Sequence, residues 1–287
     1  MPAGPTLILF ASDIHIGQTE VDTAHRLREV VSREVALRNG CLAGVFFLGD
    51  VGESLRDVAG CLSALGGLAP VQVMIPGNHD LFDTERIGSS KSKYENHLPR
   101  VVREAGWTWG ENGPVILAEH DLAIVLSPAW ASPGHLPEKM RGISRAEIFE
   151  ARRETLPDGQ WITSDWDDDA ESTRMLGRFR ANLEAIPPAI GRVIAGTHVP
   201  PFVEMMGKRD AMDGRSPWFV SHRFGEAIVA ANRSRERTWI THVLSGHTHD
   251  LVQVSIPWHP NRPALQCRSL GGSVGDPGWV LLEVEDR

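Results

Sequence analysis

Short polar clusters rich in Asp, Asn and His each follow an apolar run of the chain. They are Asp13-Ile14-His15, Gly49-Asp50, Gly77-Asn78-His79-Asp80, Thr197-His198 and Gly246-His247-Thr248-His249. Carboxylate, amide and neutral imidazole groups are oxygen and nitrogen donors without soft sulfur, a set that suits Mn, Fe, Zn or Ni. These donors outnumber what one ion needs, so they can be shared between two divalent ions about 3.5–4 Å apart, with the Asp50 carboxylate able to bridge them.

The position of the clusters predicts that they converge. The apolar runs Thr6–Ala11, Val45–Leu48 and Val71–Ile75 are typical of buried strands. They alternate with amphipathic helices predicted over 21–38 and 55–65, and this alternation predicts a parallel sheet with right-handed crossovers. Because the carboxyl ends of parallel strands lie along one edge of a sheet, side chains far apart in the sequence should meet in one crevice.

The second half of the chain lacks the regular alternation of strands and helices. We expect a hairpin from Val115–Ala118 and Leu122–Leu126, then a charged segment over 128–163 that is an insertion or lid. A helix with Ser164 and Asp167 as a capping box should follow and end near Ala185. Short apolar runs predict further strands at 192–195, 238–244, 251–256, 264–267 and 279–284.

Composition narrows the class of protein. The chain has 287 residues and a net charge of −8, which argues against a dedicated nucleic-acid coat protein. Cys41, Cys61 and Cys267 are far apart and form no CxxC pair, so we expect free buried thiols rather than a disulfide framework. No window approaches the roughly 20 apolar residues of a membrane span, and the apolar run near the start is short for a signal peptide, which favours a cytoplasmic protein.

The ordered motifs D-x-H, G-D, G-N-H-D, a lone His after a strand, and G-H-T-H resemble those of the calcineurin-like metallophosphoesterase superfamily. The resemblance covers about residues 5–85 and 190–285. It implies an α/β fold, a four-layer α/β/β/α sandwich with mixed sheets. All the motifs serve one site, so we expect residues 1–287 to form a single domain with an insertion at about 128–163.

The resemblance also implies roles for individual residues. Asp13, His15 and His249 would hold one metal, Asn78, His198 and His247 would hold the other, and Asp50 would bridge them. His79 corresponds to a histidine that is not a ligand and that assists the leaving group. Either Asp80 or Glu53 would orient this histidine, and the prediction places Asp80 with His79 as catalytic.

The predicted activity is a dinuclear metal-dependent phosphoesterase. A hydroxide formed from a water on the two ions would attack phosphodiesters, and phosphomonoesters are further candidate substrates. Manganese is favoured, and Fe, Zn or Ni also suit the donors. The expected substrate is a small nucleotide-like phosphate ester, and the oligomeric state is left open. The alternatives are a nuclease acting on DNA or RNA and a non-catalytic interaction scaffold with this fold.

Two further features bear on the substrate. Basic residues gather in 86–103 and 208–237, where they either form a solvated surface or frame the crevice and attract an anion. Trp130, Trp218 and Phe219 are the aromatic residues that could stack on a base.

Overall fold

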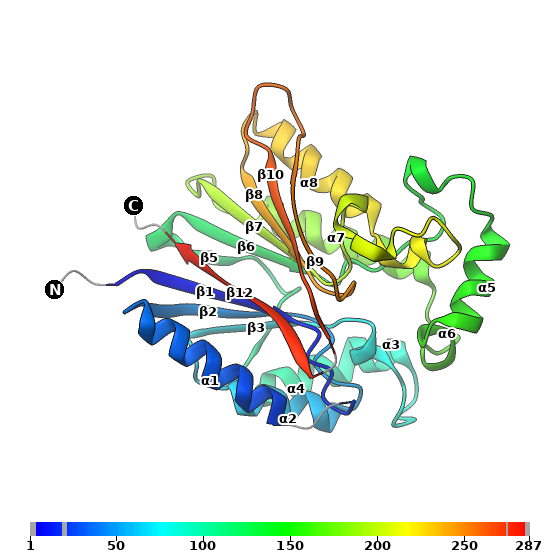
Figure 1. The fold of residues 1–287 in the computed structure, drawn as a ribbon, viewed down its shortest axis with the longest axis horizontal. Helices are drawn as coiled ribbons and strands as arrows, with labels where there is room; N and C mark the ends of the chain where they lie inside the picture. The colour runs from blue at the N-terminus through cyan, green and yellow to red at the C-terminus, as the bar shows by residue number, and fades with distance from the viewer. Residues whose placement is uncertain (1–3, 19–21, 274, 285–287) are drawn as a thin grey trace.

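Two six-stranded sheets form the centre of the protein. The computed structural model describes residues 4–18, 22–273 and 275–284, and Figure 1 shows the sheets packed face to face. The first sheet has the order β11 (Gly272–Ser273), β12 (Asp276–Val284), β1 (Thr6–Ser12), β2 (Cys41–Leu48), β3 (Val71–Ile75) and β4 (Thr108–Trp109). The second has the order β5 (Val115–Leu117), β6 (Leu122–Ser127), β7 (Arg192–Thr197), β8 (Ile240–Ser245), β10 (Leu265–Leu270) and β9 (Leu251–Ile256).

Both sheets are mixed. In the first, β1, β2, β3 and β4 run parallel and β12 is antiparallel to β1. In the second, β6, β7, β8 and β10 run parallel, while β5 and β9 are antiparallel edge strands. The β5–β6 pairing confirms the predicted hairpin, and β9, β10 and β12 confirm the predicted strands at the end of the chain.

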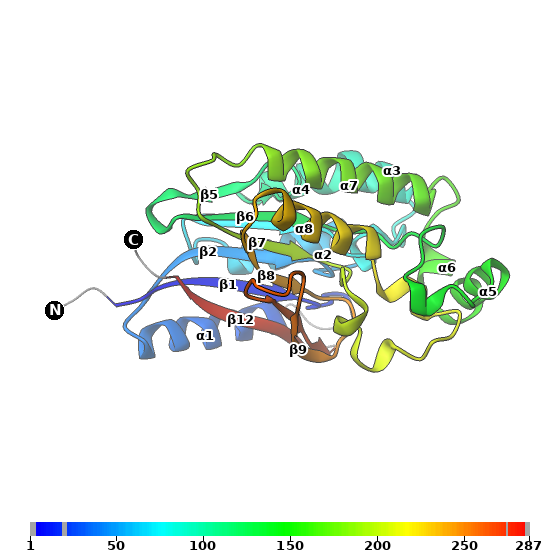
Figure 2. The same ribbon diagram turned by 90° about the horizontal axis from the view of Figure 1, so that it is seen from above.

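Helices cover the outer faces of the two sheets (Figure 1), and α7 and α8 lie toward the viewer when the sandwich is seen from above (Figure 2). On the first sheet lie α1 (Asp22–Leu37), α2 (Leu55–Leu65), α3 (Ser90–Ser92) and α4 (Leu98–Glu104), and on the second lie α7 (Asp168–Glu184) and α8 (His222–Ser234). Short 3-10 segments are η1 (His79–Leu81), η3 (Ala118–His120), η4 (Glu138–Met140), η5 (Val203–Met205), η6 (Gly207–Arg209) and η7 (Ser216–Phe219), and η2 (Lys93–His97) is a π-helical turn. The predicted mixed α/β sandwich is confirmed.

Alternation along β1 explains the layers. Ile8 and Phe10 face the second sheet, where Phe10 stacks on Phe46 with ring centroids 5.1 Å apart. Leu7 and Leu9 point the other way, into the core beneath the helices, and all four side chains are fully buried. Successive side chains of a strand point to opposite faces, so a strand buried on both faces needs a continuous apolar run. The run at 6–11 is therefore a consequence of the four layers.

The segment 128–163 lies at the carboxyl ends of the strands and contains α5 (Arg145–Thr155) and α6 (Asp158–Trp161). Its apolar side chains pack against the loop after β7. Ile148 shares one small core cluster with Trp218, and Met140 shares another with Phe219. The segment is therefore a packed cover over this end of the sandwich.

Several predicted details change in the structure. The capping residue of α7 is Asp167, whose side chain accepts a hydrogen bond from the Ala170 N–H, so Ser164 is not the cap. Cys41 is exposed, contrary to prediction, because it opens β2 at the sheet end, whereas Cys61 and Cys267 are buried. The helix α8 was not predicted. Val21, where the first helix was expected to begin, lies outside the described residues.

Among the described residues, no helix combines the length and apolar character needed to cross a bilayer.

Candidate metal centre

The predicted donors come from the edges of two sheets rather than from one. Asp13, Asp50 and Asn78 follow β1, β2 and β3 of the first sheet, while His198 and His247 follow β7 and β8 of the second. The strand alternation alone predicted one parallel sheet, whereas the two mixed sheets of the expected sandwich are observed. The carboxyl ends of parallel strands still meet, but they do so across the interface between the sheets.

The backbone at the donors is strained. Five donor residues have left-handed φ values, namely Asp13 at 60°, His15 at 50°, Asp50 at 55°, His247 at 71° and His249 at 60°. Left-handed conformations of residues other than glycine cost about 1–3 kcal/mol each and persist only where the surrounding structure enforces them. The strain aims these side chains inward instead of along the strand.

Glycines leave the space that the donors fill. A Cβ at Gly77 would overlap the Asp50 Oδ1 atom, and its distance to the Asp50 backbone nitrogen would be 2.6 Å. A Cβ at Gly246 would overlap the Ser12 hydroxyl and lie 2.6 Å from Asp13 Oδ2. The turns that bear the donors therefore require glycine beside them.

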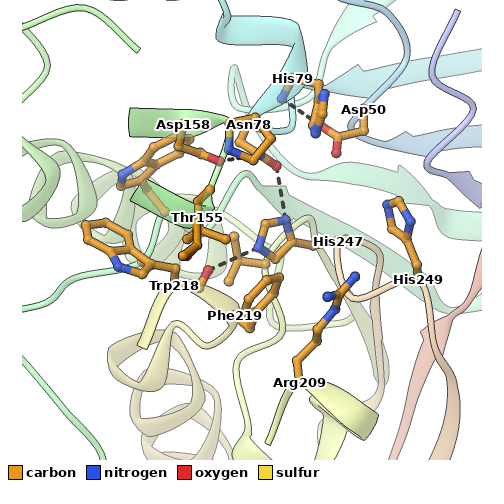
Figure 3. Close-up of a pocket in the computed structure, with 15 residues that line it drawn as sticks. Asp50, Asn78, His79, Thr155, Asp158, Arg209, Trp218, Phe219, His247 and His249 are labelled. Carbon is orange, nitrogen blue, oxygen red and sulfur yellow. Dashed lines mark hydrogen bonds between the residues drawn. The ribbon is translucent and has the colours of Figure 1, made fainter. Parts of the chain in front are cut away.

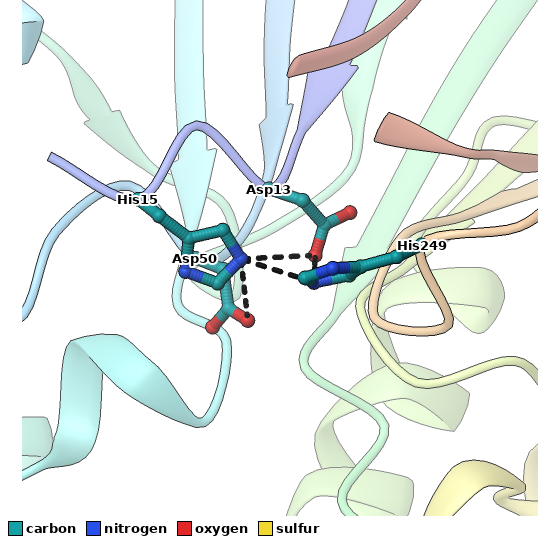
Figure 4. A group of neighbouring side chains, drawn as sticks. All are labelled: Asp13, His15, Asp50 and His249. Atoms are coloured by element: carbon teal, nitrogen blue, oxygen red, sulfur yellow. Dashed lines mark hydrogen bonds and ion pairs between the residues drawn. The ribbon is translucent and has the colours of Figure 1, made fainter. Parts of the chain in front are cut away.

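The first donor group contains Asp13, His15, Asp50 and His249 (Figure 4). The Nε2 atoms of His15 and His249 are 3.1 Å apart, and His249 Nε2 lies 3.6 Å from Asp13 Oδ1. His15 Nε2 is 3.8 Å from Asp50 Oδ2. Asp13 and His15 are almost fully buried, so their polar atoms face one another rather than water.

The second donor group contains Asp50, Asn78, His198 and His247 (Figure 3 shows three of them). The Asn78 Oδ1 atom lies 3.0 Å from His198 Nε2 and 3.0 Å from His247 Nδ1. The other nitrogens of the two rings face carbonyl oxygens, His198 Nδ1 at 2.8 Å from Leu48 O and His247 Nε2 at 3.0 Å from Trp218 O. A carbonyl only accepts hydrogen bonds, so these nitrogens carry the ring protons.

This arrangement leaves lone pairs facing one another. In a neutral imidazole only one nitrogen carries a proton, so His198 Nε2 and His247 Nδ1 present lone pairs to an amide oxygen that can only accept. Burial lowers the pKa of His198 to about 3, and burial also lowers that of His247, so both rings are neutral. Three acceptors that converge without a hydrogen between them fit a cation, which supports a metal site.

The Asp50 carboxylate belongs to both groups. One oxygen lies 3.5 Å from His198 Nε2 and the other lies 3.8 Å from His15 Nε2. Asp50 Oδ1 also accepts a hydrogen bond of 2.9 Å from the His79 backbone N–H, which fixes the carboxylate between the groups. The two groups thus fit a dinuclear metal site with one shared carboxylate.

Burial disfavours charge throughout this region. It raises the pKa of Asp13 to about 7 and that of Asp50 well above its usual value, while it lowers the pKa of His15 to about 2 and that of His249 to about 4. The charge of His79 lowers the pKa values of both carboxylates, but it offsets the effect of burial only in part. Divalent cations would supply further positive charge and favour ionised carboxylates and neutral imidazoles.

His79 lies beside the donors with Glu53 as its partner. Its Nδ1 atom is 3.2 Å from Glu53 Oε1, and Glu53 also accepts a hydrogen bond from the Gln18 side chain. Burial opposes protonation of His79, but the Asp50 charge, the Glu53 hydrogen bond and the Asp158 charge outweigh it and raise its pKa to about 9. The His79 ring is therefore protonated at neutral pH.

Asp80 is not among the residues that line the cavity next to the donor groups. Its carboxylate is fully buried and accepts hydrogen bonds from the backbone N–H groups of Val51, Gly52 and Gly77 at 2.8–2.9 Å. It therefore joins the loops after β2 and β3 and holds Asp50 and Asn78 in register. Its oxygens are thus occupied by the backbone, and the catalytic role predicted for Asp80 stays a prediction. Glu53 is the acid that contacts His79.

The donors open into a cavity of about 240 Å³ beneath the cover segment. Its wall includes apolar side chains from the cover segment and from the loop after β7: Trp130, Leu156, Pro157, Val199, Trp218 and Phe219. Trp130, Trp218 and Phe219 were the aromatic residues predicted near the substrate, and each contributes to this wall. Arg152 covers one face of Trp218, with its guanidinium carbon 4.6 Å from the ring centroid.

Thr155, Asp158 and Arg209 line the same cavity and were not predicted individually. Thr155 and Asp158 belong to a segment whose lid role was predicted, but its sequence shows no periodicity that would assign a side chain to the cavity. Arg209 lies within the basic stretch 208–237, with its guanidinium 5.0 Å from the Phe219 ring centroid. A charge pattern could have suggested the stretch, but not which residue faces the donors.

The other basic residues mostly have protein partners. Lys93 is fully buried and donates hydrogen bonds to the backbone oxygens of Glu53 and Phe82, and Lys91 pairs with Glu171 at 3.1 Å. In the second stretch, Lys208 pairs with Asp250 and Arg215 with Asp213. Among the described basic residues of the two stretches, Arg209 is the one that lines the cavity.

Comparison with known proteins agrees with this architecture. The family model described as calcineurin-like phosphoesterase matches residues 6–251. The crystal structure of a phosphopantetheinyl hydrolase from Mycobacterium tuberculosis is similar in fold, with a TM-score of 0.72 and 18% identity over 95% of this chain and 91% of that chain. GAP50, the anchor in the inner membrane complex of Plasmodium, aligns less well, at a TM-score of 0.43 and 11% identity over 96% of this chain and 80% of its own. No curated protein matches the sequence.

Proposed function

The chain belongs to the calcineurin-like phosphoesterase family and is a metal-dependent phosphoester hydrolase, and from this premise we propose that it cleaves small phosphodiesters. Phosphomonoesters are proposed as further substrates. The observation that carries the proposal is the meeting of two His/Asp donor groups at the shared Asp50 carboxylate. The predicted scaffold without catalytic activity is set aside, because the family and both donor groups point to a hydrolase.

We assign the donors as the family pattern implies. Asp13, His15 and His249 hold one ion, and Asn78, His198 and His247 hold the other, with Asp50 between them. Two divalent cations in such a site lower the pKa of a water and neutralise phosphoryl oxygens, and manganese is the ion that we propose. The neutral state of the histidine rings supports this assignment, because only a neutral imidazole has a lone pair to offer.

His79 is proposed to protonate the leaving oxygen. Its raised pKa keeps the proton on the ring at neutral pH, and the hydrogen bond to Glu53 orients the ring. Asp80 acts as a positioning residue, because its carboxylate bonds the backbone that carries Asp50 and Asn78. In this proposal His79 transfers the proton, whereas Asp80 only positions the loops that carry the metal ligands.

The apolar wall of the cavity supports a diester. A diester carries a second organic group that needs space beside the reacting phosphorus, and Leu156, Trp218 and Phe219 provide an apolar surface there. Arg209 offers a guanidinium beside Phe219 (Figure 3), where it would contact a second anionic oxygen of the substrate. A nucleotide-like group fits this combination of an apolar wall and a cation.

A small substrate is favoured over a polynucleotide. Polynucleotide binding relies on an extended row of free cations, whereas Lys91, Lys93 and Lys208 are engaged with protein groups. The cover segment also narrows the approach to the donors. A nuclease therefore remains the predicted alternative that these contacts support less well.

A metal-supplemented assay tests the proposal. The chain should hydrolyse bis(p-nitrophenyl) phosphate with added Mn²⁺, and Asp50→Asn or His247→Ala should reduce the rate by at least about 100-fold. His259→Ala, which changes an exposed histidine outside the cavity, is the matched control and should retain the rate. Wild-type rates in the Asp50→Asn variant would refute the site, and a strong preference for p-nitrophenyl phosphate would refute the diester specificity.

A further inference from the structure

We propose that Asp158, on α6 of the cover segment, is a positioning residue for the second metal. It holds the Asn78 amide with its oxygen toward His198 and His247, so that metal affinity at this group depends on the packing of the segment. The inference rests on the proposed metal centre and adds a residue that none of its motifs contains.

The contact is direct. The Asn78 Nδ2 atom donates a hydrogen bond of 3.1 Å to Asp158 Oδ2, while Oδ1 of the same amide faces the two imidazoles at 3.0 Å (Figure 3). Because an amide has a donor end and an acceptor end, fixing one end fixes the other. The carboxylate therefore determines which end of Asn78 faces the metal group.

The alternative orientation explains why a carboxylate is needed. If the amide turned over, its Nδ2 could donate to the lone pairs of His198 and His247, which would be favourable in the metal-free protein and would block a cation. The turned amide would also place its oxygen against Asp158, and two acceptors repel at hydrogen-bond distance. Asp158 therefore disfavours the orientation that cannot bind metal.

The cover segment holds Asp158 in this position from both sides. At the last residue of α6, the Trp161 carbonyl accepts a hydrogen bond of 3.0 Å from the Asp83 N–H, and just after the helix Ser90 and Thr163 exchange hydrogen bonds of 2.8 and 3.1 Å. Before α6, Arg152 pairs with Asp168 on α7. Loosening either anchor would move the acceptor away from Asn78, which couples the segment to the metal centre.

The first test is metal affinity, measured by calorimetric titration of the metal-free protein with Mn²⁺. The wild-type chain should bind two ions. Asp158→Asn should weaken one of the two by about 10–100-fold, as is typical when the partner of a ligand is removed, because an amide at 158 accepts either orientation of Asn78. Glu154→Gln is the matched control, since it removes an exposed acid from the same segment, and both affinities should remain unchanged.

A double-mutant cycle separates orientation from simple charge attraction. In the Asn78→Asp background residue 78 has two equivalent oxygens, so no orientation needs to be selected and Asp158 only repels the new carboxylate. Adding Asp158→Asn to that background should leave the Mn²⁺ affinity unchanged or increase it. A further loss of affinity would overturn the proposal, because it would show that the charge of Asp158 acts on the ion itself.

The remaining outcomes are also decisive. Thermal unfolding of the metal-free variants should match that of the wild-type chain within a few degrees, which excludes loss of the fold as the cause. A wild-type chain that binds fewer than two ions would refute the proposed function and this inference together. A wild-type chain that binds two ions while Asp158→Asn binds both with unchanged affinity would refute this inference alone.

Discussion

The surroundings of His79 determine its protonation state. His79 lies against His15 with ring centroids 4.6 Å apart, yet its pKa is raised whereas that of His15 is lowered. Both rings are desolvated, but His79 has Glu53 within hydrogen-bond distance and the Asp50 and Asp158 charges nearby. The same residue type is thus protonated at residue 79 and neutral at residue 15.

Replacing His79 tests its role in proton transfer. His79→Asn should lower the rate on a diester with a poor alkyl leaving group by about 10²–10⁴-fold, and much less on a p-nitrophenyl diester, because a good leaving group needs little protonation. Mn²⁺ stoichiometry should be unchanged. The measurement is a comparison of steady-state rates on the two substrates, and equal losses on both would exclude His79 as the general acid.

The individual donors could be predicted from sequence, but their partners could not. Asp13, His15, Asp50 and the later histidines stand at strand ends in a recognisable order, so residue type and position were sufficient. The choice between Asp80 and Glu53 as the partner of His79 was open, because Asp80 directly follows His79 in its motif and Glu53 stands three residues after Asp50. It depends on where a buried carboxylate finds backbone N–H groups, and spacing does not encode that.

At the scale of elements, the turns after β2 and β3 position the site. The loop after β3 passes so close to Asp50 that Gly77 has no space for a side chain, and Asp80 ties the two loops together. These loops are short and carry few side chains of their own. The metal centre therefore depends on the close approach of two backbones as well as on the donors.

A methyl group at Gly77 tests this close approach. Gly77→Ala should displace the Asp50 carboxylate and reduce Mn²⁺ binding and activity by about 10-fold or more, because the added Cβ overlaps Asp50 Oδ1. Gly60→Ala is the matched control: residue 60 lies in α2 with open space around it, and alanine there should stabilise the helix by up to about 1 kcal/mol. Normal Mn²⁺ affinity in Gly77→Ala would contradict the argument.

The cover segment is held by a buried ion pair between α5 and α7. Arg152 pairs with Asp168, which also accepts a hydrogen bond of 2.8 Å from the Trp130 indole. Burial raises the pKa of Asp168 to about 6, although the Arg152 charge opposes this rise. Removing Arg152 would leave a buried carboxylate without a counter-charge and would raise that pKa further.

Arg152→Ala should therefore destabilise the metal-free protein by about 3–5 kcal/mol at about pH 7.5. Asp168 binds its proton more tightly in the folded than in the unfolded state, so its contribution to stability is lost as the pH rises through that pKa and recovered as the pH falls. The deficit should be smaller at about pH 5.5, where Asp168 is mostly protonated in the wild-type chain and more fully protonated in the variant. Urea unfolding at the two pH values measures it.

Arg153→Ala provides the control for this change. Arg153 is exposed and pairs with its neighbour Glu154 at 3.1 Å, so its removal should change the free energy of unfolding by less than about 1 kcal/mol. A deficit of Arg152→Ala that stays constant or grows as the pH falls would contradict the assignment of the ion pair.

For the whole molecule, the alternation of strands and helices predicted one parallel sheet, and only the motif resemblance implied the four layers with two mixed sheets. The strands β1–β3 of one sheet and β6–β8 of the other have similar apolar sequences, because all of them are buried on both faces. The pairing of β12 with β1 and of β10 with β8 joins residues far apart in the chain, and no local pattern specifies it. The helix α8 was missed although Phe224, Ala227 and Ile228 have helical spacing, because its charged residues suggested a surface loop.

We propose that the chain folds as one domain, because the donors come from both sheets and a metal bound between them joins the two halves. Ions that bind only the folded state stabilise it by about 4 kcal/mol each at free concentrations of 1,000 times Kd. Chelation with EDTA should therefore lower the Tm by about 10 °C or more in a single transition, whereas Asp50→Asn should respond to EDTA much less. Scanning calorimetry with and without EDTA is the measurement, and two separate transitions, or an equal EDTA effect on both proteins, would refute the proposal that the metals join the sheets.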